Sequence, residues 1–172
     1  MGRGAPLTMK VGDSPRAMRA AVLAMKRADR EVRRDVSARM RSVMNPVWRS
    51  ELAQHLTGWT MEGQMILPGA RIATGNPGQL VTASSKRKVG SGGGLVPDRN
   101  WAGYEYGASR DDVSEVTRKG TTYKRHTKRH LPARRANGRV IGPTVRAVLP
   151  RIAAFWTQSV VRAFLDAADK RN

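Results

Sequence analysis

Two long amphipathic segments, one towards each end of the chain, most constrain what this sequence can fold into. Apolar residues recur at intervals of three and four through residues 18–47, which is the spacing of one face of an α-helix. A second, broader apolar face runs through residues 145–164. The sequence therefore predicts a long N-terminal helix that begins near Pro15 and a closing C-terminal helix over residues 145–168.

Two prolines fall inside these helical patterns. Pro46 should kink or interrupt the N-terminal helix, because its ring clashes with the carbonyl group four residues earlier. We expect a second helical piece through Trp48 and Leu52 that ends near Gly58. Pro150 should likewise make the start of the C-terminal segment a separate piece that ends there.

Between these helices, residues 59–107 consist of short apolar runs bounded by Gly and Pro, which is typical of a small antiparallel sheet. Residues 75–78, Gly-Asn-Pro-Gly, predict a turn, because Asn and Gly tolerate positive φ and Pro fixes its own φ. The predicted fold class is α+β: a long N-terminal helix and a C-terminal helix packed on a small, mainly antiparallel β-sheet, with long basic loops. The predicted strands are residues 64–67, 70–74, 79–84 and 101–106, with a last short strand at 138–141.

The length of 172 residues fits one domain, or one domain with extended arms. We expect an N-terminal arm at residues 1–12, a single α+β domain at 13–169 and a tail at 170–172. Within the domain, residues 85–94 should form a flexible loop rich in basic residues and Gly. Residues 108–138 hold few apolar side chains, so we expect a protruding basic loop that contains a long hairpin through residues 121–123.

Positive charge is the strongest clue to partners. The net charge is +19, and residues 116–165 contain no Asp or Glu while carrying twelve Lys or Arg. A polyanion or an acidic protein surface is therefore the expected partner. The candidate contact residues, all in the two basic loops, are Lys86, Arg87, Lys88, Arg118, Lys119, Lys124, Arg125, Lys128, Arg129, Arg134, Arg135 and Arg139.

The composition restricts the class of protein. Cysteine is absent, which excludes disulfides and thiolate metal sites. Residues 1–11 carry basic side chains but lack the continuous apolar run of a secretory signal, and no later segment approaches the length of a membrane span. We expect a soluble protein with no membrane partner.

No metal or cofactor site is predicted. His126 and His130 lie four residues apart, as zinc ligands on one helix face would. No Cys and no nearby acid completes a ligand set, however, and the flanking Lys and Arg side chains would repel a cation. Residues 90–94 are rich in Gly but lack the Lys-Ser or Lys-Thr of a nucleotide-binding loop, so they indicate a linker.

Acidic residues near the second basic loop give only weak support for catalysis. Glu105, Asp111, Asp112 and Glu115 are close in sequence, and paired carboxylates can carry out acid–base chemistry. No His or Ser is placed to complete a constellation, and acids beside a basic loop are more often salt-bridge partners. We therefore predict no catalytic residues and no enzyme, and a hydrolase built on residues 111, 112 and 115 stays as an alternative.

The aromatic residues bear on how a nucleic acid would be contacted. Proteins that bind single strands interleave aromatic rings with basic residues. Here only Tyr123 lies inside the basic loop, whereas Trp48, Trp59, Trp101 and Trp156 lie in apolar contexts typical of a core. Contact with phosphate backbone, without base readout, is the interpretation that the sequence favours.

Two short motifs and the order of elements carry a resemblance to a known family. The run Tyr104-Glu105-Tyr106-Gly107 is followed by Ala108-Ser109, and residues 143–147 read Pro-Thr-Val-Arg-Ala at the start of the predicted last helix. The chain resembles, over residues 15–168, the head–tail joining or tail-completion proteins from the neck of long-tailed double-stranded-DNA phages. That family has an aromatic-Glu-aromatic-Gly-Thr motif and a Pro-apolar-apolar-Arg-Pro-Ala motif at these places. This chain departs from the first motif after Gly107, where Ala108-Ser109 replaces the usual continuation. It departs from the second at Thr144, where a large apolar residue is usual, and at Ala147, where a second proline is usual.

The resemblance implies a non-enzymatic structural virion subunit. Such a subunit assembles as a ring, expected to be a hexamer, between the head connector and the tail tube, around a channel that passes genome DNA. The implied partners are further copies of the chain, the adjacent neck and tail proteins (head-closure or connector, tail-terminator or tube subunits) and the genome DNA itself. The implied location is the head–tail interface of the virion, after synthesis in the bacterial host cytoplasm. The alternative is a basic nucleic-acid-binding protein of ribosomal or nucleoid type, for which charge this high is ordinary.

The first motif also carries an expectation about geometry. On a strand that ends at Gly107, the tyrosines at 104 and 106 would share one face, and Glu105 would point to the other. We therefore expect Glu105 to face solvent or an Arg of the neighbouring subunit. The candidate inter-subunit or structural positions are Tyr104, Glu105, Tyr106, Gly107, Pro143 and Arg146.

Overall fold

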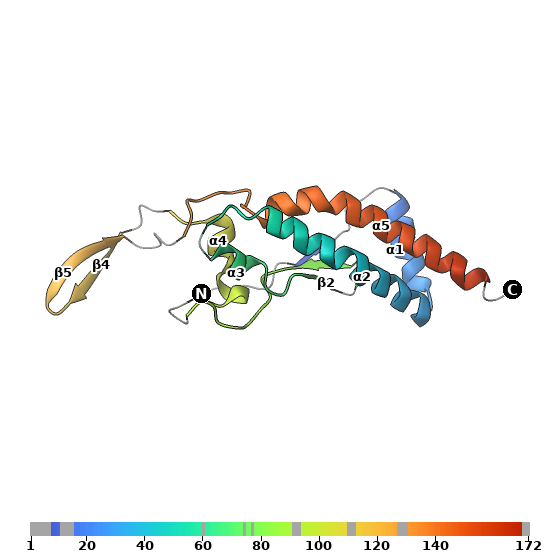
Figure 1. Ribbon diagram of the computed structural model, residues 1–172, viewed down its shortest axis with the longest axis horizontal. Coiled ribbons are helices and arrows are strands. Elements are labelled where there is room, and N and C mark those ends of the chain that lie inside the picture. Colours follow the sequence, from blue (N-terminus) through green and yellow to red (C-terminus); the bar gives the residue numbers. More distant parts are fainter. Residues whose placement is uncertain are drawn as a thin grey trace.

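The computed structural model shows an elongated α+β protein. It describes residues 8–10, 16–59, 61–73, 75–76, 78–90, 94–109, 113–126 and 131–169. Figure 1 shows a body of long helices above a small sheet, and a two-stranded hairpin that projects beyond one end of the body. The predicted α+β class, with long helices towards both ends of the chain, is confirmed.

The N-terminal helical region is divided into α1 (Arg16–Arg27) and α2 (Arg30–Gln54). Asp29 begins α2 as its N-cap, and its side chain accepts a hydrogen bond from the backbone N–H of Val32 at 3.0 Å. The guanidinium of Arg33 donates to the carbonyl oxygen of Ala28, at 2.9 Å from Nε and 2.7 Å from Nη2. These polar contacts satisfy backbone groups on both sides of the break, so the chain changes direction without leaving them unpaired.

The predicted interruptions at the two prolines do not occur. Helix α2 continues through Pro46, and α5 (Ile141–Asp169) continues through Pro150. Both prolines lie on the exposed side of their helices, where water can reach the carbonyl group that loses its partner. Buried neighbours such as Trp48 and Ile152 hold each helix to the body beyond its proline.

A three-stranded antiparallel sheet has the order β1-β3-β2. Its strands are β1 (Thr8–Lys10), β2 (Arg71–Ala73) and β3 (Gln79–Val81), and Leu80 pairs with Met9 on one side and Ile72 on the other. The strand predicted at 70–74 is thus confirmed in its central part, and the strand predicted at 79–84 is confirmed in its first half. The sheet also takes in residues 8–10, which were predicted to belong to a separate arm.

Three predicted strands are wrong. Residues 64–67 lie largely in α3 (Glu62–Ile66), residues 101–106 lie in α4 (Pro97–Tyr106), and residues 138–141 form a turn that leads into α5. In α4 the buried positions are 97, 101, 104 and 105, which is helical spacing. Short apolar runs do not distinguish a buried strand from one or two turns of helix, and here the proline at the first helical position favoured the helix.

The core lies between the long helices. Helix α5 packs along α2 and also contacts α1, and α2 contacts β2 as well, so the C-terminal helix packs chiefly on another helix and not on the sheet as predicted. The indole N–H of Trp48 donates to the carbonyl oxygen of Val81 at 3.0 Å, which ties α2 to β3. Trp48, Trp101 and Trp156 are buried and Trp59 packs against the core, so the prediction that the tryptophans are core residues is confirmed.

Candidate functional site

The carboxylate of Glu105 closes the start of helix α5. Glu105 is 1% exposed, and its Oε2 accepts hydrogen bonds from the backbone N–H groups of Val140 at 3.1 Å and Ile141 at 2.9 Å. Its Oε1 accepts from the N–H of Gly142 at 3.0 Å. The first N–H groups of a helix have no partner within it, and a negative charge there is favoured by the helix dipole. We call Glu105 and these three N–H groups the clasp.

The prediction that Glu105 faces solvent or a neighbouring subunit is therefore wrong. It rested on the alternation of a strand, whereas the helix α4 places Tyr104 and Glu105 on the buried side. Tyr106 is 40% exposed and lies at 6.1 Å, between ring centroids, from Trp101. Burial raises the pKa of Tyr104 above its ordinary value.

Two glycines allow the chain to leave and re-enter the body at the clasp. Gly107 ends α4 with φ +70°, and Gly138 precedes α5 with φ +73°, both in the left-handed region that glycine tolerates best. A Cβ on Gly138 would overlap Oε1 of Glu105, and one on Gly107 would overlap the carbonyl oxygen of Ala133. The chain thus passes out through Gly107 and returns through Gly138, and we call residues 108–138 the arm.

Backbone hydrogen bonds join the two ends of the arm. The N–H of Ala108 donates to the carbonyl oxygen of Pro132 at 3.0 Å, and the N–H of Arg135 donates to that of Tyr106 at 2.7 Å. The motif around residues 104–107 and the segment that opens α5 are therefore in contact, although more than 30 residues of sequence separate them. The first of the two motifs that carry the family resemblance thus holds the helix start that directly precedes the second.

The outer part of the arm is an antiparallel hairpin, which confirms that prediction. Its strands are β4 (Val113–Arg118) and β5 (Thr121–His126). Lys119 and Gly120 form the turn, with φ of +52° and +78°, which is typical of the two-residue turns that match the twist of a hairpin. No described residue of the hairpin belongs to the hydrophobic core.

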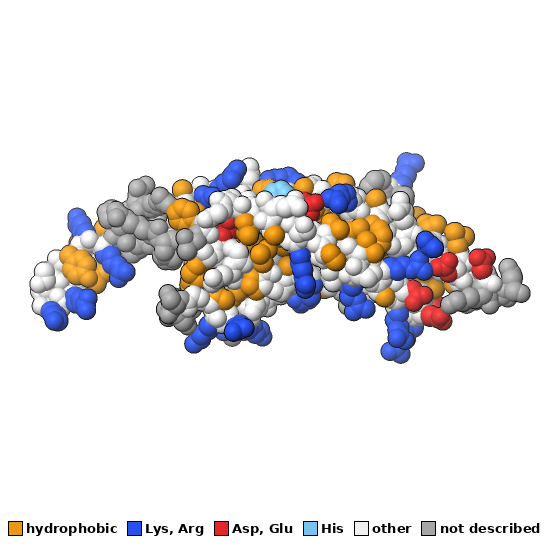
Figure 2. Space-filling view, viewed as in Figure 1, with side chains coloured by type: hydrophobic (Ala, Val, Ile, Leu, Met, Phe, Trp, Pro, Cys, Tyr) orange, Lys and Arg blue, Asp and Glu red, His pale blue; other side chains and the backbone are white. Residues whose placement is uncertain are grey.

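The two faces of the hairpin differ in chemistry. On one face, Glu115 lies opposite Lys124, and the hydroxyl groups of Thr117 and Thr122 are hydrogen-bonded at 2.9 Å. The other face, which we call the Tyr123 face, pairs Val116 with Tyr123. By the alternation of a strand it also carries Arg118 and Arg125. Figure 2 shows an apolar patch on the hairpin with Lys and Arg side chains around it.

The remaining predicted contact residues are distributed over the surface. Lys86, Arg87 and Lys88 are exposed in the loop before the Val89–Leu95 bridge. Arg134 and Arg135 are exposed at the base of the arm, and Arg139 is half-buried there. Lys128 and Arg129 lie outside the described residues, as does the centre of the Gly-rich loop at 91–93. The hairpin exposes four basic side chains, those of Arg118, Lys119, Lys124 and Arg125. On α5, Arg146 is exposed, and Pro143 is half-buried in the first turn of the helix.

The candidate catalytic acids are not brought together in the described part of the chain. Glu105 is engaged in the clasp, whereas Glu115 is exposed on the hairpin. Asp111, Asp112 and His130 lie outside the described residues, and so does the side chain of His126. Within the described ranges, no group of three or more His, Asp or Glu side chains is placed to hold a metal ion.

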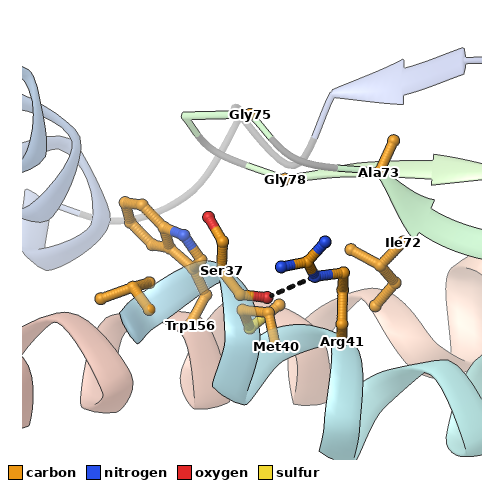
Figure 3. A pocket seen from close by; sticks show the side chains of 9 residues that line it. Ser37, Met40, Arg41, Ile72, Ala73, Gly75, Gly78 and Trp156 are labelled. Atoms are coloured by element: carbon orange, nitrogen blue, oxygen red, sulfur yellow. Dashed lines mark hydrogen bonds between the residues drawn. The ribbon is translucent and has the colours of Figure 1, made fainter. Parts of the chain in front are cut away.

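One hollow lies between α2, α5 and the sheet. Figure 3 shows Met40, Ile72 and Trp156 around it, with the guanidinium of Arg41 donating to the carbonyl oxygen of Ser37 at 3.2 Å. Its volume is about 10 Å³, which is room for a single water molecule. The hollow is therefore a packing gap and not a ligand site.

Sequence reasoning missed the part of the site that depends on contacts between distant residues. Gly138 and Gly142 were not singled out, although both pack against Glu105 and its hydrogen-bond partners. A Gly-x-x-x-Gly spacing before a helix is too common to indicate such a contact. The Tyr123 face, by contrast, follows from strand alternation once residues 113–126 are known to be a hairpin.

None of the described helices combines the length and the hydropathy that crossing a membrane requires. No protein-family model, curated protein or solved structure matches this chain.

Proposed function

We propose that this chain is a structural virion subunit that forms a ring in the neck of a long-tailed double-stranded-DNA phage. The ring joins the head connector to the tail tube and surrounds the DNA channel. Its partners are further copies of the chain, six in a closed ring, and the adjacent head-closure, connector, tail-terminator or tube proteins. It carries out no catalysis and binds no cofactor.

The observation that carries this proposal is the clasp. The family resemblance rests on two short motifs, each too brief to be specific alone. In the fold, Glu105 of the first motif accepts hydrogen bonds from the N–H groups of Ile141 and Gly142, directly before Pro143 of the second motif. The first motif therefore fixes the helix start from which the second motif continues, which places both motifs at one point of the fold and supports the resemblance.

The shape of the subunit also suits a ring that contacts different neighbours. A closed ring uses a heterologous interface, in which two different patches of the same chain meet. The body offers one such patch on the last turns of α5, where Val161 and Leu165 are 54% and 61% exposed and Phe164 lies beside them. The projecting arm leaves a second surface free for the channel or an adjacent ring (Figure 1).

Native mass spectrometry and negative-stain microscopy of the purified full chain test this proposal. We expect a closed ring, and the double substitution V161D/L165D should convert it to single subunits with an unchanged circular dichroism spectrum, since both side chains are exposed. The matched variant V113D/Y123D, which places two Asp residues on the arm, should leave the ring intact. A chain that stays monomeric at all concentrations would overturn the proposal.

The second candidate function is a basic nucleic-acid-binding protein of ribosomal or nucleoid type. The exposed hairpin, with Arg118 and Arg125 on the same face as Tyr123, is the feature that favours it. Binding of free duplex by a single subunit, without any ring, would support this candidate over the neck protein.

A further inference from the structure

Packing within the fold does not explain the exposed side chains of the hairpin. An isolated two-stranded hairpin is at best marginally stable in water. Here Tyr123 is 43% exposed beside its half-buried cross-strand partner Val116, and neither belongs to the core. An aromatic side chain left uncovered with an apolar neighbour on a projecting element is a surface suited to contact with a partner.

The register separates a face with balanced charge from a face that is basic. On the Glu115 face the one acid of the described hairpin lies opposite Lys124, so part of its charge is balanced. The Tyr123 face carries Arg118 and Arg125 with no described acid among its residues. Arginine and tyrosine on one face provide guanidinium groups for phosphates and a ring for apolar or stacking contact.

The spacing on this face fits a nucleic-acid duplex. The pairs that contain Arg118 and Arg125 are separated by four positions along the ribbon, which is about 13 Å at ~3.3 Å per residue. The major groove of B-form DNA is about 12 Å wide and admits a two-stranded β-ribbon. A ribbon laid across the groove therefore places one guanidinium at the phosphates of each wall, with Tyr123 and Val116 between them.

We infer that the Tyr123 face of the hairpin binds double-stranded DNA, with Arg118 and Arg125 on the phosphates and without reading the base sequence. In the neck this face would lie towards the channel, a placement that rests on the proposed function, whereas the binding itself does not. Two phosphate contacts per subunit are individually weak, which allows DNA to slide past a ring of such arms.

The experiment measures the affinity of the full-length protein for a mixed-sequence DNA duplex of about three helical turns at several salt concentrations. The test variant is R118Q/R125Q, and the matched control is K119Q/K124Q, which removes the same charge from the turn and from the Glu115 face of the same hairpin. A third variant, R118K/R125K, keeps the charge.

In the test variant we expect affinity at about 0.1 M salt to fall roughly tenfold and the slope of log affinity against log salt to decrease by about 1.8. The control should change affinity less than about threefold, and R118K/R125K should retain most of the slope. Equal losses in the test variant and the control would overturn the inference. Tighter binding of the corresponding single strand, lost with Y123A, would also overturn it, because the partner would then be unpaired bases.

The failure of this inference can be distinguished from the failure of the proposed function. A closed ring that does not bind duplex overturns the inferred DNA contact but leaves the proposed neck function intact. The arm would then be inferred to bind an acidic neighbouring protein. Duplex binding that depends on Arg118 and Arg125 in a protein that never forms a ring supports the contact and overturns the neck proposal.

Discussion

The body and the arm use apolar side chains in opposite ways. In the body, Trp48 and Trp156 are 1% and 2% exposed, and their neighbours on α2 and α5 form a continuous core. In the arm, Tyr123 and Val113 remain more than two-fifths exposed. The body thus contains the interactions that stabilise it, whereas the described hairpin gains little from the rest of the chain.

This difference indicates that the body determines the stability of the protein, whereas the hairpin is available for binding a partner. Burial of large apolar side chains is the main favourable term in folding, so substitutions in the body should change stability. Exposed charged and aromatic groups contribute little to folding, so substitutions in the hairpin, the outer part of the arm, should change partner binding. The clasp lies at the boundary, since Glu105 belongs to the body but fixes the point at which the arm begins and ends.

The largest expected effect comes from removing the clasp. Glu105→Ala leaves three backbone N–H groups at the start of α5 without their acceptor, two of them in hydrogen bonds that are fully buried. We expect the free energy of unfolding to fall by about 4 kcal/mol, because each unpaired buried donor costs about 1–3 kcal/mol. Urea denaturation followed by circular dichroism measures this change.

Glu115→Ala is the matched control, an exposed acid on the arm that should change stability by less than about 0.5 kcal/mol. Similar losses for the two acids would contradict the distinction between body and arm.

Two glycine substitutions, one at the clasp and one in the hairpin turn, test the same difference between the body and the arm. Gly138 and Gly120 have φ of +73° and +78°, so Ala costs similar backbone strain at both. A Cβ at 138 overlaps the carboxylate of Glu105, which three hydrogen bonds hold in place, whereas a Cβ at 120 meets no atom within 4 Å. We expect Gly138→Ala to destabilise the body by about 3 kcal/mol.

Gly120→Ala should strain only the hairpin turn and leave the main unfolding transition within about 0.5 kcal/mol of the wild type. Differential scanning calorimetry of the two variants provides the test. If both shift the transition equally, backbone strain and not the contact with Glu105 accounts for the effect.

Much of the body could be predicted from periodicity alone. The spacing of apolar residues located α2 and α5, and the Gly-Asn-Pro-Gly run located the β2–β3 connection. The strands predicted at residues 64–67 and 101–106 were wrong for a shared reason: apolar runs this short do not distinguish a strand from one or two turns of helix. The break between α1 and α2 at Asp29 was missed because apolar residues continue in register on both sides of it. The break is stabilised by the capping bond from Val32 to Asp29 and by the hydrogen bond from Arg33 to Ala28.

In the candidate site, too, the features that depend on local sequence could be predicted, and those that depend on distant contacts could not. Charge and strand alternation are local properties, so the exposed basic residues of the hairpin could be recognised from sequence. The clasp depends on contacts across 35 to 37 positions of the chain, from Glu105 to the start of α5. No local pattern indicates whether such a carboxylate is exposed or buried, and the predicted strand placed it on the wrong side.

Alkaline pH provides a smaller test within the body. Burial raises the pKa of Tyr104 in the folded protein, so the neutral phenol is favoured there relative to the unfolded chain. The stability from this group is complete below the pKa of the unfolded chain, about 10, and decreases as pH rises above it. Chemical denaturation at pH 8 and pH 11 should show a smaller loss for Tyr104→Phe than for the wild type. Identical losses would mean that Tyr104 ionises as readily in the fold as outside it.

The smallest expected effect on stability comes from removing the hairpin altogether. Replacing β4, the turn and β5 with a short Gly-Ser linker deletes residues that contribute nothing to the core, while the clasp and the bond from Ala108 to Pro132 remain. The free energy of unfolding should therefore stay within about 0.5 kcal/mol of the wild type, because a longer or shorter surface loop changes closure entropy only slightly. The same variant should lose the hairpin-dependent share of duplex binding measured by its salt dependence. A large loss of stability would show that the hairpin supports the body after all, and the exposed Tyr123 face would then need a partner within the chain.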